Sequence, residues 1–182
     1  LLASEWLAAE LDAIGIPAPS TGRMQDFGGG MRNVLGEIPG REPGEAIVIG
    51  AHLDHIGPGN GIYNGADDNA SGTGAILEIA KAFVASGKQP RRRVVFVWFD
   101  GEERGLLGSA AFVKNIPFAD ETVVMINLDM VGMLKRDTLK IYGATTGGAV
   151  LDGWLEAAKE GSGLLLEKSE IVNSNSDHAN FY

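Results

Sequence analysis

The sequence predicts an α/β fold, a three-layer sandwich in which a mostly parallel central sheet is flanked by helices on both faces. Three observations lead to this prediction. Apolar runs of strand length alternate along the chain with stretches of helical periodicity. The 182 residues are 45% hydrophobic, which is enough for one domain with a substantial core. Neither an internal repeat nor a linker interrupts the pattern, so we expect a single domain over residues 1–182.

The first half of the chain contains a helix, two strands and a second helix. Apolar residues at helical spacing predict a helix over residues 4–14, which a glycine and a proline then terminate. A loop at residues 28–30 consists of glycines. Runs rich in β-branched residues, bounded by glycine and proline, predict strands over residues 33–38 and 46–52. A long amphipathic pattern predicts a helix over residues 73–85.

The second half of the chain continues the alternation of strands and helices. Residues 94–99 form a continuous apolar run, typical of a strand that is buried on both faces. The segments that follow are a helix over residues 105–114, strands over residues 123–128 and 139–142, a helix over residues 151–158 and a short strand over residues 164–166. Because helices separate most of these strands, we expect most strand pairs to be parallel.

Composition argues against several classes of protein. A formal net charge of −9 argues against nucleic acid and anionic membranes as partners. No apolar run has the length of a membrane span, so we expect no membrane insertion. The absence of cysteine excludes a disulfide framework, a thiolate nucleophile and a cysteine zinc site. Many of the 26 glycines lie beside acidic motifs, where tight loops bring the backbone close to a ligand.

Five residues of metal-ligand type stand in settings that suit metal binding. They are His52, Asp68, Glu103, Asp129 and His178. Two imidazoles and three carboxylates have the number and chemical type needed by two zinc ions that share one carboxylate. Glu102, next to one of them, is left free to move protons. This set of residues indicates metal-assisted hydrolysis.

Most of these residues follow predicted strands. Open α/β sheets place their sites at the carboxyl ends of strands, and this is where the histidine and glutamate motifs fall. Side chains alternate along a strand, so His52 and Asp54 should lie on the same side, with Asp54 accepting the second ring N–H of His52. The same alternation predicts that His55 turns the other way, into a structural or solvated position.

Each motif alone also has a simpler explanation. The histidine could be a buried, hydrogen-bonded residue, the aspartate pair Asp67–Asp68 could cap a helix, and the glutamate pair Glu102–Glu103 could be a solvated turn. Adjacent like charges at a strand end are unfavourable unless a positive charge such as a metal compensates them. Jointly the motifs favour a metal centre. If each motif had its own simpler explanation, the order of the motifs along the chain and their shared position at strand ends would be coincidences.

The motifs together resemble those of the dizinc aminopeptidases of the bacterial leucyl aminopeptidase type, in the MH clan of zinc exopeptidases. The resemblance spans about residues 33–182. It rests on Gly50-Ala-His-Leu-Asp54, Gly65-Ala-Asp-Asp-Asn-Ala-Ser-Gly72, Glu102-Glu-Arg-Gly-Leu-Leu-Gly-Ser109, Asn127-Leu-Asp-Met-Val-Gly132 and Ser176-Asp-His178. It implies a zinc-peptidase catalytic domain with the phosphorylase/hydrolase-like fold of zinc exopeptidases.

The resemblance implies a role for each candidate ligand. Asp68, which directly precedes the asparagine of its motif, would bridge two zinc ions. Together with Glu103 and His178 it would hold one of them. Together with His52 and Asp129 it would hold the other.

The resemblance also implies an activity. Asp54 would orient the metal-binding histidine, and Glu102 would be the catalytic acid and base in the release of N-terminal residues from peptides. We expect an extracellular or periplasmic location, and the sequence leaves the oligomeric state open. Members of this type continue past the Ser-Asp-His motif, so we expect a C-terminal part to be missing. The alternatives are a carboxypeptidase or dipeptidase of the same clan, a glutaminyl-cyclase-like enzyme that typically uses one zinc, and a noncatalytic binding domain.

Overall fold

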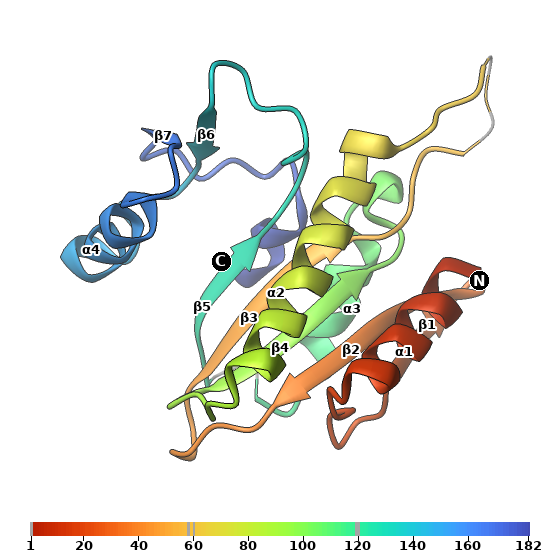
Figure 1. Cartoon of the computed structure of the whole chain (residues 1–182). Helices are drawn as coiled ribbons and strands as arrows, with labels where there is room; N and C mark the ends of the chain where they lie inside the picture. The colour runs from red at the N-terminus through yellow and green to blue at the C-terminus, as the bar shows by residue number, and fades with distance from the viewer. Residues whose placement is uncertain (1, 58, 60, 119–120) are drawn as a thin grey trace.

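Helices cover both faces of a five-stranded sheet in the computed structural model, which describes residues 2–57, 59, 61–118 and 121–182 (Figure 1). The strands, in their spatial order, are β1 (Met24–Gly28), β2 (Met31–Ile38), β4 (Arg93–Phe99), β3 (Ala46–His52) and β5 (Thr122–Asn127). The helices that pack on the sheet are α1 (Leu2–Ile14), α2 (Gly72–Ser86) and α3 (Leu107–Asn115). The predicted α/β architecture with helices on both faces is therefore present.

The central sheet is mixed, so the expectation of a mostly parallel sheet is wrong. Strand β3 is parallel to both of its neighbours, β4 and β5, whereas β2 is antiparallel to β1 and to β4. A hairpin explains part of the difference, because Gly29 and Gly30, with φ of 62° and 75°, reverse the chain between β1 and β2. A connection without a helix, over residues 39–45, then reverses the chain again before β3.

Two apolar clusters hold the helices to the sheet. On one face, Leu11 of α1 and Ile76 of α2 pack with Phe96 and Trp98 of β4. On the other face, Phe112 of α3 packs edge-on against Phe99, with ring centroids 5.8 Å apart. Strand β4 therefore contributes to both clusters, as its continuous apolar sequence predicted.

A smaller unit stands apart from the central sheet. Strands β6 (Thr138–Ile141) and β7 (Leu165–Lys168) form a separate parallel pair, and α4 (Gly148–Lys159) connects them. These three elements were predicted to within a few residues, and Figure 1 shows them beyond the β5 edge of the central sheet. Across the described ranges, none of the helices is both long and apolar enough to cross a membrane.

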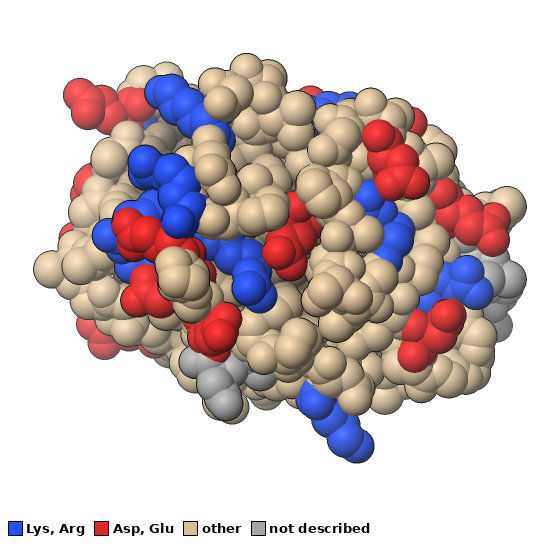
Figure 2. Space-filling model, turned by 90° about the horizontal axis from the view of Figure 1, so that it is seen from below, with Lys and Arg blue, Asp and Glu red and all other residues tan. Residues whose placement is uncertain are grey.

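The basic run before β4 is neutralised by glutamates. Each arginine forms one ion pair: Arg91 with Glu42, Arg92 with Glu45 and Arg93 with Glu37. Figure 2 shows that, on the face seen from below, basic side chains lie among acidic ones. This arrangement is typical of a solvated strand entry and not of a surface that binds polyanions.

The fold brings three loops to one edge of the sheet. Strands β3, β4 and β5 run in the same direction, so their carboxyl ends share an edge. His52 is the last residue of β3, the segment η2 (Glu102–Arg104) follows β4, and Asp129 follows β5. The segment η1 (Ala66–Ser71), which leads into α2, brings Asp68 to the same edge.

A glycine at the start of α2 permits a close approach to the loop after β5. An ideal Cβ at Gly72 would lie 2.3 Å from the carbonyl oxygen of Leu128 and 2.4 Å from Oδ1 of Asn69. We expect Gly72→Ala to lower the free energy of unfolding by at least about 1–3 kcal/mol, the usual cost of overpacking, because a backbone carbonyl cannot rotate away. Equilibrium unfolding in urea measures this change.

Gly74→Ala is the matched control for this substitution. Gly74 lies two residues further along the same helix, and a Cβ there would meet nothing within 4 Å. Alanine has the higher helix propensity, so Gly74→Ala should leave stability unchanged or raise it by up to about 1 kcal/mol. Equal losses in the two variants would show that the approach to Leu128 is not what requires glycine at residue 72.

Candidate metal centre

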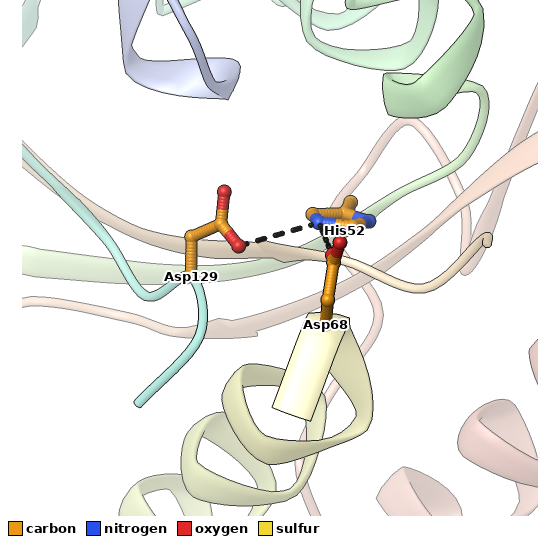
Figure 3. Close-up of side chains that lie close together, drawn as sticks. All are labelled: His52, Asp68 and Asp129. Atoms are coloured by element: carbon orange, nitrogen blue, oxygen red, sulfur yellow. Dashed lines mark ion pairs between the residues drawn. The ribbon is translucent and has the colours of Figure 1, made fainter. Parts of the chain in front are cut away.

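Three of the predicted ligands converge at the edge of the sheet. Nε2 of His52 lies 3.2 Å from Oδ1 of Asp68 and 3.5 Å from Oδ1 of Asp129 (Figure 3). The imidazole is almost fully buried, with 1% of its side chain exposed, whereas the two carboxylates are 38% and 26% exposed. Solvent therefore reaches this group from the side of the carboxylates.

A second group of potential ligands includes a histidine that sequence reasoning had placed elsewhere. Nitrogen and oxygen atoms of His55, Asp68 and Glu103 lie within 4.8 Å of one another. The expectation that His55 turns away from the site is wrong, because β3 ends at His52 and strand alternation does not continue into the following loop. Asp68 belongs to both groups, which is the position required of a shared ligand.

The donor atoms fit a divalent ion such as zinc. Two ligands bound to one tetrahedral zinc at about 2.1 Å lie about 3.4 Å apart, close to the distances from His52 to Asp68 and Asp129. In the second group, Nδ1 of His55 and Oε1 of Glu103 are buried and have no hydrogen-bond partner among the described residues. Uncompensated buried polar atoms are costly, and a cation in this group would compensate them.

The electrostatic state of His52 supports this interpretation. Burial alone lowers the pKa of its imidazole, but interactions with Asp129 and Asp54 and the charge of Glu102 outweigh burial and raise the pKa to about 11. The surrounding carboxylates thus stabilise positive charge at this point strongly. A site of this kind attracts a cation, whether a proton or a metal ion.

Asp54 connects the buried histidine to the loop after β4. Nδ1 of His52 donates a hydrogen bond to the main-chain carbonyl of Asp54 at 3.1 Å, while the Asp54 carboxylate lies 3.7 Å from the same nitrogen. The predicted bond to the Asp54 side chain is therefore replaced by one to its main chain, because the carboxylate accepts the backbone N–H groups of Glu102 and Glu103, at 3.0 and 3.3 Å. Burial raises the pKa of Asp54, but His52 and these two N–H groups outweigh it and hold the pKa below its ordinary value.

We expect Asp54→Asn to keep the fold and to weaken metal binding at His52 by about 10–100-fold, as outer partners of metal ligands commonly do. The amide keeps one acceptor oxygen but loses the charge that supports the imidazole and the glutamate loop. Competition with a chromogenic zinc chelator measures the affinity. Asp100→Asn is the control, because Asp100 also accepts a backbone N–H, from Arg32, yet belongs to neither ligand group. Unchanged zinc affinity in Asp54→Asn would contradict the supporting role.

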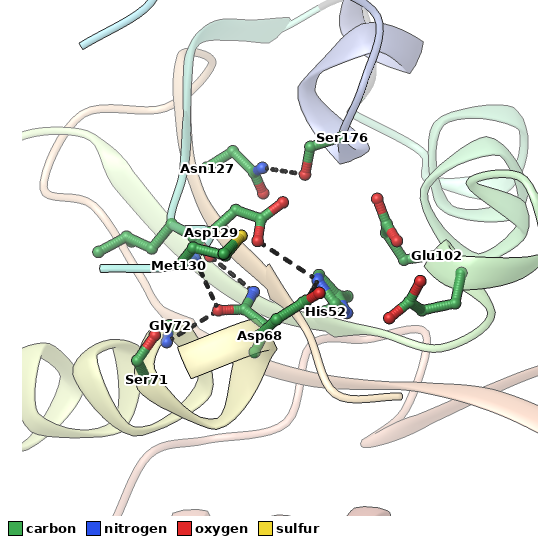
Figure 4. A network of polar contacts seen from close by, with 12 residues as sticks. His52, Asp68, Ser71, Gly72, Glu102, Asn127, Asp129, Met130 and Ser176 are labelled. Carbon is green, nitrogen blue, oxygen red and sulfur yellow. Dashed lines mark hydrogen bonds and ion pairs between the residues drawn. The ribbon is translucent and has the colours of Figure 1, made fainter. Parts of the chain in front are cut away.

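Asn69 fixes Asp68 relative to Asp129. Its side chain is buried, its amide donates to the carbonyl of Leu128 at 2.9 Å, and its oxygen accepts the N–H groups of Gly72 and Met130. Figure 4 shows these bonds between the start of α2 and the loop after β5. The segments that carry the two carboxylates are therefore tied together by one buried amide.

Glu102 lies beside the metal-type residues but belongs to neither ligand group. In Figure 4 its side chain lies near His52, on the opposite side from Asp129. Burial raises the pKa of Glu102 to about 7; the charge of His52 opposes this shift, and the neighbouring carboxylates add to it. A carboxyl group with such a pKa suits proton transfer near neutral pH.

His178, the remaining predicted ligand, lies outside both groups of described residues. It sits in the segment η4 (Asp177–Phe181), and its Nε2 donates to the carbonyl of Asn173 at 2.7 Å. Burial raises the pKa of the nearby Asp129, but hydrogen bonds with His52 and Ser176 outweigh burial and hold it below the ordinary value. Its role as a metal ligand stays a prediction.

A network of buried hydrogen bonds anchors the segment that carries His178. The sequence did not predict this network. Asp177 is fully buried and accepts a hydrogen bond from the Ser109 hydroxyl at 2.5 Å, and Asn180 donates to the same hydroxyl at 2.9 Å. Burial raises the pKa of Asp177 to about 7, against the opposing effect of the Ser109 hydrogen bond. Each of these residues lies inside or beside a recognised motif, but nothing in either motif signals that the two motifs meet.

Comparisons with known proteins relate this chain to peptidases. Residues 33–182 match a family model described as Peptidase family M28. The chain is 35% identical over 133 residues to leupeptin-inactivating enzyme 1 of Streptomyces exfoliatus, covering 70% of this chain and 28% of that protein. It is 40% identical over 112 residues to leucine aminopeptidase 1 of Trichophyton rubrum, covering 57% of this chain and 30% of that protein. The chain thus spans less than a third of the length of these curated relatives.

Solved structures show the same fold. The LapA aminopeptidase of Legionella pneumophila superposes with a TM-score of 0.77 at 24% identity, over 98% of this chain and 50% of that chain, which is evidence for the fold alone. BSAP, a zinc aminopeptidase from Bacillus subtilis, superposes with a TM-score of 0.66 at 29% identity, over 82% of this chain and 37% of that chain.

Proposed function

The chain belongs to peptidase family M28, and on this premise we propose that it acts as a zinc-dependent aminopeptidase, releasing N-terminal residues from peptides. The proposal rests above all on one observation, the position of Asp68 in two groups of potential metal ligands at once. The names of the relatives support it, since one inactivates leupeptin and others are leucine aminopeptidases. A zinc aminopeptidase among the similar structures supports the choice of metal.

We propose that two zinc ions bind at this edge of the sheet. His52 and Asp129 would hold one ion, Glu103 would hold the other, and Asp68 would be shared between them. The resemblance to dizinc aminopeptidases gives the second ion the imidazole of His178. When bound, the ions supply polarisation of the peptide carbonyl and a lower pKa for the attacking water.

Glu102 moves the proton in this proposal. It accepts a proton from the attacking water and returns it to the nitrogen of the leaving amine as the peptide C–N bond breaks. Its half-buried position beside the ligand groups, without being part of either, suits both steps. The Asp54 carboxylate holds the backbone N–H of Glu102, which keeps the proton carrier close to the metal-binding residues.

The hydrolysis of leucine p-nitroanilide before and after removal of metal tests the proposal. We expect dialysis against a chelator to lower the rate by at least about 100-fold, because neither the Lewis acid nor the activated water remains. Titration with zinc should restore the rate as the second equivalent binds. Hydrolysis that survives complete removal of metal would reject the proposal.

Three further substrates separate the alternatives. N-acetyl-leucine p-nitroanilide should resist hydrolysis, because an aminopeptidase acts next to a free amine. Release of C-terminal residues from N-blocked peptides would instead indicate a carboxypeptidase, and cyclisation of an N-terminal glutamine would indicate a glutaminyl-cyclase-like enzyme. A chain that binds zinc and leaves all of these substrates unchanged would be a noncatalytic binding domain.

A further inference from the structure

The contact between His55 and Glu103 has no part in the chemistry proposed above. Nδ1 of His55 lies 3.1 Å from Oε1 of Glu103. Both atoms are buried, and neither forms a hydrogen bond with any described residue. Burying two polar atoms in this way costs free energy. Their ion-pair contact offsets part of that cost, and a cation beside Glu103 would offset the rest.

The ring of His55 is held in place from the other side. Its edge-on contact with Tyr63 places the ring centroids 6.3 Å apart. Gly65 lies so close that a Cβ there would be 3.2 Å from Cγ of His55. Both neighbours belong to the loop that leads into the segment of Asp68, so the ring is packed between that loop and Glu103.

Two successive residues therefore contact different parts of Glu103. Asp54 accepts the backbone N–H of Glu103, and His55 lies against one oxygen of its side chain. A carboxylate has two oxygens, so one can be held by the imidazole while the other remains available to a cation. Carboxylates that bind metals are commonly oriented by an outer polar partner, and the ion-pair contact with His55 is such a partner for Glu103.

We propose that His55 is a positioning residue for Glu103 and thereby sets the affinity of the second zinc position. This inference rests on the two-zinc centre of the proposed function. The structure gives His55 an ion-pair contact with Glu103 but none with Asp68, the ligand that both ions share. An imidazole bound to the ion itself would lie about 3.4 Å from each of its fellow ligands, so the geometry favours support of Glu103 over direct binding.

Calorimetric titration of the metal-free protein with zinc tests the role of His55 without any measurement of activity. In His55→Ala, the affinity for the second ion should fall by about 10–100-fold while the first ion binds as before. In His55→Asn, most of the affinity should return, because the amide nitrogen of asparagine takes the place of Nδ1. Tyr63→Phe is the control, since it keeps the aromatic ring against His55, and it should bind both ions normally.

Two results would overturn the inference. A second-ion affinity in His55→Ala within about 3-fold of the unmodified protein, against the about 10–100-fold typical of outer partners, would show that His55 does not position Glu103. Complete loss of the second ion in both the alanine and the asparagine variant would make His55 a ligand. The titration of the unmodified chain tests the proposed function separately, because a protein that binds fewer than two ions has no second position to support.

Discussion

Replacing Asp68 with alanine is expected to weaken both metal positions at once. Its carboxylate lies 3.2 Å from His52 and also belongs to the group that contains Glu103. Loss of an outer partner costs about 10–100-fold in metal affinity, so loss of a direct ligand should cost each position at least about 100-fold. Removing the shared negative charge also leaves the two ions to repel each other more strongly. Zinc titration of the metal-free variant measures both affinities.

The neighbouring carboxylate provides the control for this variant. Asp67 lies outside both ligand groups, and its oxygen accepts the N–H of Gly132 at 2.8 Å. Asp67→Ala should therefore bind two zinc ions nearly as well as the unmodified chain. If Asp68→Ala keeps two tightly bound ions, or if Asp67→Ala loses them instead, the assignment of the bridging ligand is wrong.

Glu102→Gln should lower kcat by at least about 10²-fold and leave both zinc ions in place, because it removes a proton carrier without removing a metal ligand. Glutamine has nearly the same size and can occupy the same half-buried position, but it cannot take a proton from water. The rate of leucine p-nitroanilide hydrolysis and the zinc content of the same sample measure the two effects. The contrast is Glu103→Gln, in which the zinc content should fall. Near-normal turnover in Glu102→Gln would remove this residue from the mechanism.

The sequence predicted the elements whose hydrophobic pattern is typical of only one kind of secondary structure. Strand β4 is an unbroken apolar run, and it packs into both apolar clusters of the sheet. Strand β1, in contrast, is Met-Gln-Asp-Phe-Gly, which has neither an apolar run nor a burial pattern that stands out, and it was not predicted. Without β1 the glycines that follow it could not be recognised as a hairpin turn, so the antiparallel half of the sheet was missed as well.

The sequence predicted which candidate ligands lie together where those residues occupy strand ends. His52, Asp68 and Asp129 could be grouped because each lies at or near an element end that the sequence indicates. Strand alternation does not predict the direction of His55, because this residue lies in a loop, where side-chain direction follows the packing against Tyr63 and Gly65. The bond between Ser109 and Asp177 joins residues that are 68 positions apart, and no local pattern encodes it.

The convergence of β3, η1 and the loop after β5 has a consequence for how the chain folds. An ion bound by His52, Asp68 and Asp129 would join three segments that are far apart in the unfolded chain. The unfolded chain does not hold these ligands together and therefore binds the ion weakly. Binding that favours only the native state stabilises it, by about 2.7 kcal/mol when the free ion stands at 100 times its dissociation constant. Without the ion, this contribution to the free energy of unfolding is absent. The stability of the protein should then depend on the concentration of free zinc, as linkage between binding and folding requires.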